Sequence, residues 1–350
     1  MGSRTLCYVH AQEVNPLAGQ DEHETLETLF RNVDASFAKN IALGCFHSSD
    51  PGRYPRNPLG VFRTFIVMRI KGVRSLREMT RSLDTDPRLR KLCLIKPDEA
   101  GYPRSVLSRF IRRVGEDNLT RIIEQKVARL LKRNKAGDVD AVLDASFIKA
   151  WSTRDPLDCK RGFSDHEAMV GRAGRKFDLG YKLHLSIDAE TMLPLTSVLA
   201  SANQNEKKHS PHLLDKTKAL LKRCGARLKR VIAESQYSDG RIRKAVSETV
   251  IPYPANQKRN VKNLLRVDKK FRTHGLEDQK REYHKRPRIE AVYSFLKTQH
   301  SMTANKVRGI KNVASYALYS LLCLVPNREA AQNTKQARQS NLTNILRHII

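Results

Sequence analysis

Apolar residues recur every three or four positions through the first third of the chain, which is the spacing of an amphipathic helix. The first set consists of Leu26, Leu29, Phe30, Val33 and Phe37. The apolar run 61–70 predicts a second, more buried helix, beyond a loop rich in proline, glycine and serine. Ser75 and Glu78 have the spacing of a capping box, so we expect a third helix to begin there and to end before Pro87.

Two more helices are predicted between residues 105 and 131. The apolar stripe of the first comprises Val106, Leu107, Phe110, Ile111 and Val114. The rest of its surface carries Arg104, Arg109, Arg112 and Arg113. An arginine-rich helix after a turn is compatible with a helix-turn-helix that binds DNA, and equally with a helical bundle whose basic face is solvated. The polar segment 132–137 ends this pattern, so we expect a helical N-terminal domain over residues 1–136.

Beyond this boundary the period of the pattern falls to two, as in β-strands. Strands are predicted at 141–148, 180–188, 193–200, 228–234 and 249–253, with helices at 211–223, at 240–247 and from Pro287 onward. Residues 152–178 show little periodicity and are expected to form a long loop. The pattern predicts an α/β domain with a mixed sheet flanked by helices over residues 137–326, followed by a polar tail over 327–350.

Two of the predicted strands each carry an acid that is a candidate site residue. Asp144 lies inside the first strand, and Glu234 ends the fourth. A buried carboxylate is unfavourable unless a cation or a hydrogen-bond donor lies beside it. Asp144 is therefore either a site residue or a structural aspartate near a strand end, and its motif alone does not separate the two.

The composition indicates the class of molecule that the protein binds. The chain has 65 lysines and arginines against 36 aspartates and glutamates, a formal net charge of +29 and a pI of about 10.1. This excess favours a polyanion, nucleic acid first and an anionic membrane surface second. No apolar run reaches the roughly 18 residues needed to span a bilayer, and residues 1–14 lack the apolar segment of an export signal. Because the six cysteines are scattered, we expect no disulfide framework, which suits a reducing cytoplasm. The lack of a membrane span and the positive charge predict a soluble, nucleoid-associated protein.

The helix that begins at Pro287 has two distinct faces. Proline suits the first helical position, where its missing N–H costs nothing. The buried stripe is expected to comprise Ile289, Val292, Tyr293 and Leu296. Glu290 and Lys297, two turns apart, share another face. The segment 258–288 before and at its start has 12 lysines and arginines against four acids, which favours contact with DNA. A basic, solvated helix is the alternative for the motif alone.

Tyr283, Arg286, Glu290 and Lys297 follow one another at intervals of three, four and seven residues. This pattern resembles the tyrosine-arginine-glutamate-lysine signature of bacterial and archaeal insertion-sequence transposases with a DDE active site. The order of predicted strands and helices is similar to the ribonuclease H-like fold of those enzymes. Segments near residues 58, 72–78 and 107–110 also resemble their N-terminal helical, DNA-binding domain. The resemblance extends over about residues 58–326.

The resemblance implies three catalytic carboxylates that bind metal. Asp144 matches the first aspartate of the family and Glu290 its glutamate, whereas Glu234 occupies the position of the second aspartate. The implied cofactor is a pair of Mg²⁺ ions, for which Mn²⁺ can substitute, with Asp144 bridging them and the other two acids holding one each. Glutamate is one methylene longer than the aspartate of the family pattern, so the resemblance leaves the activity of this chain open.

The same resemblance implies which residues contact DNA. Arg286 and Lys297 are expected to bind phosphate near the cut strand. Tyr283 is expected to stack on or hydrogen-bond the displaced strand, and a core tyrosine is an equal alternative. The expected DNA-binding surface is completed by Arg288, Arg109, Arg112 and Arg113.

The implied function is that of a transposase. It binds the terminal inverted repeats of its own element, cuts the strand at each end and joins the freed end to target DNA. Double-stranded DNA is the expected partner, bound by a homodimer, and no membrane is involved. Two alternatives stay open: a transposon-derived DNA-binding protein that no longer cuts, and a metal-dependent nuclease without strand transfer.

Overall fold

A mixed sheet of six strands lies at the centre of the protein, whose computed structural model describes residues 56–153, 162–252, 281–303 and 306–333 and residues 26, 27, 30, 40 and 44. The central strand β1 (Asp138–Lys149) pairs antiparallel with β3 (Lys176–Asp188) and parallel with β5 (Arg227–Ala233). On the outer sides, β4 (Pro194–Ser201) and β2 (Met169–Ala173) pair antiparallel with β3, and β6 (Glu248–Val250) pairs parallel with β5.

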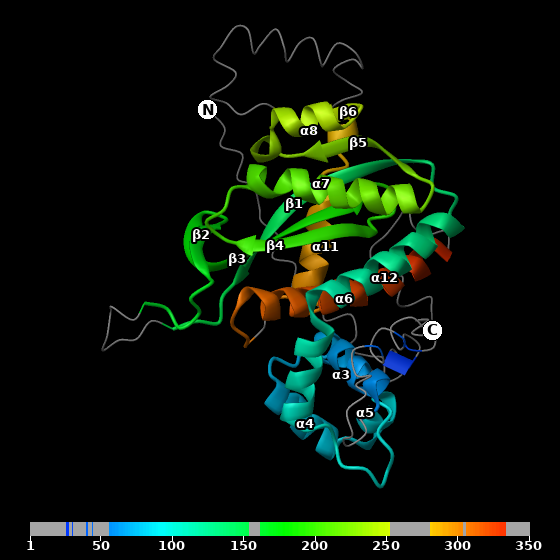
Figure 1. Ribbon diagram of the computed structural model, residues 1–350, viewed down its shortest axis with the longest axis vertical. Coiled ribbons are helices and arrows are strands. Elements are labelled where there is room, and N and C mark those ends of the chain that lie inside the picture. The colour runs from blue at the N-terminus through cyan, green and yellow to red at the C-terminus, as the bar shows by residue number, and fades with distance from the viewer. Residues whose placement is uncertain are drawn as a thin grey trace, which may run out of the picture.

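Helices flank this sheet. The helix α7 (Glu206–Arg223) packs against β3, β4 and β5, and α11 (Pro287–Thr298) packs against β1. The long helices α6 (Arg104–Arg133) and α12 (Ile310–Asn333) pack along each other and on β4. In Figure 1, α3 (Pro58–Ile70), α4 (Leu76–Thr85) and α5 (Pro87–Leu92) gather at the opposite end of the molecule from α8 (Gly240–Ala245) and β6. The predicted fold class, a mixed sheet flanked by helices, is confirmed.

The helices before the sheet follow the hydrophobic pattern closely. Ser75 caps α4 by accepting a hydrogen bond from the Glu78 N–H at 3.2 Å, whereas the Glu78 carboxylate accepts from the Arg74 N–H at 3.2 Å. The two helices predicted between 105 and 131 are the two halves of α6, which kinks at Gly115, where φ is 66°. The helix predicted over 26–37 lies largely outside the described residues, although Leu26 and Phe30 are helical and buried.

The N-terminal helices are firmly attached to α12, the last helix of the described residues. Arg69 of α3 is buried, and its guanidinium lies 4.8 Å from the ring centroid of Tyr316 in α12. It donates hydrogen bonds to the carbonyls of Ser301 and Val73, each at 3.3 Å. One continuous cluster of buried apolar residues includes both these helices and the sheet. Because the core continues across residue 136, the division into two domains at that residue stays a prediction.

Two predicted elements differ from the structure. Residues 152–178 were expected to form one loop, but 169–173 are β2, and β3 already begins at Lys176. This hairpin exposes most of its side chains on both faces, so it lacks the apolar alternation by which a strand is predicted. The helix α7 starts at Glu206, before the predicted start at Pro211. The Lys207 carbonyl, which Pro211 cannot pair, accepts hydrogen bonds from Arg241 at 3.2 Å and Ser210 at 3.4 Å.

A polar tail is predicted after Pro326, and the structure describes only its first residues. The helix α12 includes Pro326 and continues to Asn333, and residues 334–350 lie outside the described part of the chain. Polar composition alone does not reveal where a helix ends. Among the described residues, no helix is long and apolar enough to cross a membrane.

Candidate active site

The register of the sheet places Asp144 and Glu234 side by side. The parallel strands β1 and β5 pair up to Leu143 and Ala233, so the next residue on each strand is one of the two acids. β5 ends at Ala233, and the chain turns into the 3₁₀ helix Ser235–Tyr237. Glu234 is therefore the residue at the end of β5, whereas Asp144 lies within β1, which continues to Lys149 along β3.

Glu290 approaches the same point from the first turn of α11. This helix is held on β1 by its buried stripe of Ile289, Val292, Tyr293 and Leu296. The Tyr293 hydroxyl lies 2.9 Å from the Asp144 carbonyl oxygen and 2.8 Å from the Leu183 carbonyl oxygen. One buried hydroxyl thus fixes α11 against both β1 and β3, directly beneath the backbone of Asp144.

All three acids contact a single cation, the guanidinium of Arg286. Its Nη1 lies 2.9 Å from Glu290 Oε1, and its Nη2 contacts Glu234 Oε1 and lies 3.8 Å from Asp144 Oδ2. The exposed side-chain fraction rises from 16% for Asp144 to 36% for Glu234 and 56% for Glu290. Asp144 therefore forms the buried floor of the cluster and Glu290 its solvent edge.

The ionisation of Asp144 reflects its position at this floor. Burial raises the pKa of Asp144 to about 6, and the negative charges of Glu234 and Glu290 act in the same direction. The hydrogen bond from the Ala145 N–H and the positive charge of Arg286 oppose the shift. Partial burial lowers the pKa of Lys297, and the charge of Asp144 opposes that change. The two side chains therefore influence each other across the site.

A cavity of about 1110 Å³ opens over Asp144 and Glu234, whereas Glu290 does not line it. Its wall includes Asp144, Glu234, Arg286 and Lys297 at one end and residues of the β2–β3 hairpin at the other. Lys182 and Glu206, a largely buried ion pair at 2.7 Å, also line it. The space is as large as the clefts that bind sizeable ligands.

The donor set fits hard divalent cations, which prefer carboxylate oxygens. Within the described residues, no three His, Cys, Asp or Glu side chains are grouped closely enough to hold a metal ion as they stand. The guanidinium of Arg286 lies among the acids, and their oxygens point at it. The site is thus chemically suited to a cation. In this structure the guanidinium of Arg286 is the cation that the three acids contact.

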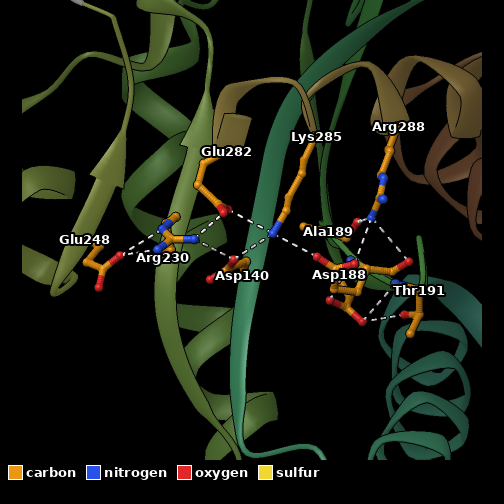
Figure 2. A network of polar contacts seen from close by, with 10 residues as sticks. Asp140, Asp188, Ala189, Thr191, Arg230, Glu248, Glu282, Lys285 and Arg288 are labelled. Atoms are coloured by element: carbon orange, nitrogen blue, oxygen red, sulfur yellow. Dashed lines mark hydrogen bonds and ion pairs between the residues drawn. The ribbon is translucent and has the colours of Figure 1, made fainter. Parts of the chain in front are cut away.

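A second polar network holds the segment that carries Arg286 (Figure 2). Lys285 Nζ lies 3.3 Å from Asp140, 2.8 Å from Glu190 and 2.9 Å from Glu282. Arg230 of β5 pairs with Asp140 at 2.9 Å, with Glu282 at 2.5 Å and with Glu248 at 2.6 Å. Lys285 and Glu282 thereby join the start of α11 to β1 and β5, the two strands that carry the other acids.

The remaining predicted DNA-binding residues are placed in different surroundings. Tyr283 is half-buried against the core. Figure 2 shows Arg288 beside Ala189, whose carbonyl oxygen accepts a hydrogen bond from it. Arg288 also lies 3.2 Å from Glu190 and does not line the cavity. The arginines on the first half of α6 are exposed and also lie outside the cavity: Arg109, Arg112 and Arg113. Their contact with DNA stays a prediction.

Sequence reasoning missed the structural role of several charged residues. Lys285 and Arg230 lie in basic stretches that look like DNA contacts, yet both are committed to acids of the same chain. Lys182 and Glu206 were likewise missed as a pair, because they are far apart in sequence. Acids interspersed among the basic residues of 281–290 were the feature of the sequence that could have indicated ion pairs within the chain.

A model of the transposase DDE domain family matches residues 135–325, which include all three acids and Arg286. The chain belongs to the transposase DDE domain family. A second model, described as a transposase domain, matches residues 15–113. No protein with a curated function matches the chain.

Solved structures of transposases match the chain at low identity and with low TM-scores. A piggyBac transposase synaptic complex with hairpin DNA is 10% identical, with a TM-score of 0.46, over 94% of this chain and 79% of that chain. The Mos1 strand transfer complex is 12% identical, with a TM-score of 0.25, over 82% of this chain and 81% of that chain. The family assignment accordingly comes from the sequence models.

Lys285→Met is expected to destabilise this transposase. The change leaves Asp140, Glu190 and Glu282 without a cation that contacts all three, while Arg230 still pairs with two of them. We expect a loss of about 2 kcal/mol in unfolding free energy, below the range for a fully buried pair. Urea unfolding measures it, and Lys311→Met, an exposed lysine of α12, is the control. Equal stability of the two variants would show that the network does not hold α11.

Asp144 should make the metal-free protein less stable as pH rises. An unfolded aspartate ionises near pH 4, whereas the folded pKa of Asp144 is about 6, so between these values the folded state binds more protons. The unfolding free energy contributed by this group falls over that window by at most about 3 kcal/mol. Asp144→Asn lacks the effect, so its stability relative to the wild type should grow from pH 4 to 6. Parallel pH curves in chelator would contradict the raised pKa.

Proposed function

We propose that this chain is a DNA transposase that hydrolyses a strand at each end of its element and joins the freed 3′-hydroxyl to target DNA. The observation that carries the proposal is the convergence of Asp144, Glu234 and Glu290 on one cation in a chain of the transposase DDE domain family. Cutting a phosphodiester requires a place where developing negative charge is stabilised. Divalent cations supply that stabilisation, and the acids at the end of β5, within β1 and on α11 are the oxygen ligands that would hold them.

The same three carboxylates are proposed to hold divalent metal, with Mg²⁺ as the physiological ion and Mn²⁺ as a substitute. When bound, such ions stabilise charge on the attacking, leaving and phosphoryl oxygens of an in-line displacement. Asp144, the most buried of the three acids, would hold the metal together with Glu234 and Glu290. Lys297, on the cavity wall, is proposed to bind a phosphate of the cut strand.

Arg286 is proposed to exchange partners when DNA arrives. Its guanidinium lies among the acids, so it competes with any divalent ion for their oxygens. Two oxygens of a phosphate can accept the paired N–H groups of a guanidinium as the two oxygens of a carboxylate do, so phosphate is an alternative partner for arginine. Transfer of Arg286 to phosphate frees the carboxylates at the moment substrate is present. Binding of metal and binding of DNA then favour each other to the same extent.

Recognition of the element ends is proposed to involve the helical region before the sheet. Arg109, Arg112 and Arg113 are exposed on the first half of α6, and the chain as a whole carries a net charge of +29. Exposed arginines at a helix surface bind the phosphate backbone and give the binding a strong salt dependence. Since two element ends must be brought together, we propose that a homodimer acts on the DNA.

Glu234 is the residue that favours the main alternative, a DNA-binding protein that no longer cuts. In the structure, however, its longer side chain reaches the guanidinium of Arg286, so the site accommodates glutamate. A nuclease without strand transfer is the second alternative. The formation of joined products separates it from a transposase.

Replacement of the acids tests the proposed chemistry. Asp144→Asn, Glu234→Gln and Glu290→Gln should each lower metal-dependent cleavage of a labelled element-end duplex by about a thousandfold or more, since each removes a ligand charge. Glu234→Asp should also be slower than the wild type, because the shorter side chain withdraws from a site built around glutamate. Strand cleavage and joining are measured together with Mg²⁺ and with Mn²⁺. Wild-type rates in all the Glu234 variants would remove this residue from the site.

Replacement of Arg286 tests the exchange of partners without measuring activity. In the absence of DNA, Arg286→Gln should bind Mn²⁺ about tenfold more tightly than the wild type, because the variant lacks the guanidinium that competes for the carboxylates. A tenfold change in affinity corresponds to roughly 1.4 kcal/mol of binding free energy. Added DNA should strengthen Mn²⁺ binding only in the wild type. Electron paramagnetic resonance of free Mn²⁺ gives both affinities. Arg227→Gln, which breaks an exposed pair with Asp138 at the opposite end of the strands, is the control. Weaker Mn²⁺ binding by Arg286→Gln would refute the exchange.

A further inference from the structure

The far wall of the cavity is formed by the hairpin of β2 and β3. Here β3 extends beyond β4 and β1, and residues 176–178 pair only with β2. The strands are joined by a tight turn at Gly174, whose φ of 66° suits glycine. Gly171 allows close packing, since a Cβ there would lie 2.1 Å from the Ala202 carbonyl oxygen. The hairpin is therefore a regular extension of the sheet and not a loop.

One face of the hairpin presents an aromatic and an aliphatic side chain to the cavity. Arg172 pairs with Phe177 and Val170 with Leu179, so these four side chains share a face. Val170, Arg172 and Phe177 line the cavity that also contains Asp144 and Glu234. Phe177 is 76% exposed and Val170 is 51% exposed, an unusual state for large apolar groups. Such residues on a cavity wall indicate a partner that covers them.

The charge around these residues indicates which partner fits. Arg172, Arg175 and Lys176 are exposed at the end of the hairpin, and the acid of this segment, Asp178, is paired with Lys149 at 2.8 Å. A second copy of the chain would bring its own net charge of +29 to a basic surface. A polyanion is attracted to it instead. The combination of an aromatic face with flanking cations is the one that binds unpaired nucleic acid, because bases stack and phosphates pair.

Polar groups elsewhere on the cavity wall suit the edges of bases. Asn203 and Gln236 are exposed amides that line the same cavity as Phe177. An amide both donates and accepts, as the edge of a base does. A paired duplex keeps its bases stacked on one another, so only bases released from that stack can lie on Phe177.

We propose that the cavity face of the β2–β3 hairpin, chiefly Phe177, binds unpaired bases of the DNA strand that leads to the carboxylates. This inference rests on the proposed function, since the cavity joins the hairpin to the acids. Phe177 supplies the stacking surface, Arg172 pairs with an adjacent phosphate, and the amides of Asn203 and Gln236 contact base edges. The hairpin thereby holds a locally opened strand on the path to Asp144.

The test compares two fluorescent duplexes of one sequence, one fully paired and one with a central bubble of unpaired bases, bound in chelator. The wild type should prefer the bubble. Phe177→Ala should weaken binding to the bubble by roughly ten- to a hundredfold, with a much smaller effect on the paired duplex. Phe177→Tyr retains a stacking ring and should bind as the wild type does. Arg172→Gln should instead lower the slope of log affinity against log salt by about one.

Met169→Ala is the matched control, because Met169 is exposed on the same hairpin but pairs with Gly180 and does not line the cavity. It should leave both affinities unchanged. An equal loss on both duplexes, or no loss in Phe177→Ala, would overturn the proposal. So would a change in oligomeric state of Phe177→Ala without DNA, since that would identify a protein contact. Failure of the wild type to bind either duplex would instead count against the proposed function.

Discussion

Mutual repulsion among three carboxylates is the constraint on which the rest of the site depends. Asp144, Glu234 and Glu290 come from three elements and meet at one point, where burial already raises the pKa of Asp144 to about 6. Such a cluster needs a cation or a bound proton among its members. In this protein the guanidinium of Arg286 fills that role, and it comes from the same segment of chain as Glu290.

The surrounding structure serves to hold these four groups in place. The parallel pairing of β1 and β5 sets two acids side by side, and the Tyr293 hydroxyl fixes α11 beneath them. Lys285 and Arg230 tie the start of α11 to the same strands through partly buried ion pairs. Because these contacts hold the backbone on both sides of Arg286, its side chain can change partners while Glu290 remains in position. That division between a fixed helix and an exchangeable cation links metal binding to DNA binding in our account.

Much of this could be predicted from sequence, for physical reasons. The strand around Asp144 and the helix from Pro287 have strong periodicity and a proline at the helical start, and both form as predicted. The hairpin at 169–180 was missed because two exposed faces and several charges conceal its alternation. The contacts of Lys285 with Asp140 and of Arg286 with Glu234 depend on folding, since partners far apart in sequence leave no local pattern. For the same reason the chain's basic residues could not be divided in advance into internal partners and DNA contacts.

We propose that the three acids bind divalent metal once Arg286 has moved to DNA. A crystal structure of the protein with Mn²⁺ and an element-end duplex tests it most directly, because anomalous scattering locates the metal. The account predicts Mn²⁺ bound by oxygens of Asp144, Glu234 and Glu290, with the Arg286 guanidinium on a DNA phosphate. Metal bound elsewhere, or a guanidinium that still joins the acids while DNA occupies the cavity, would contradict it.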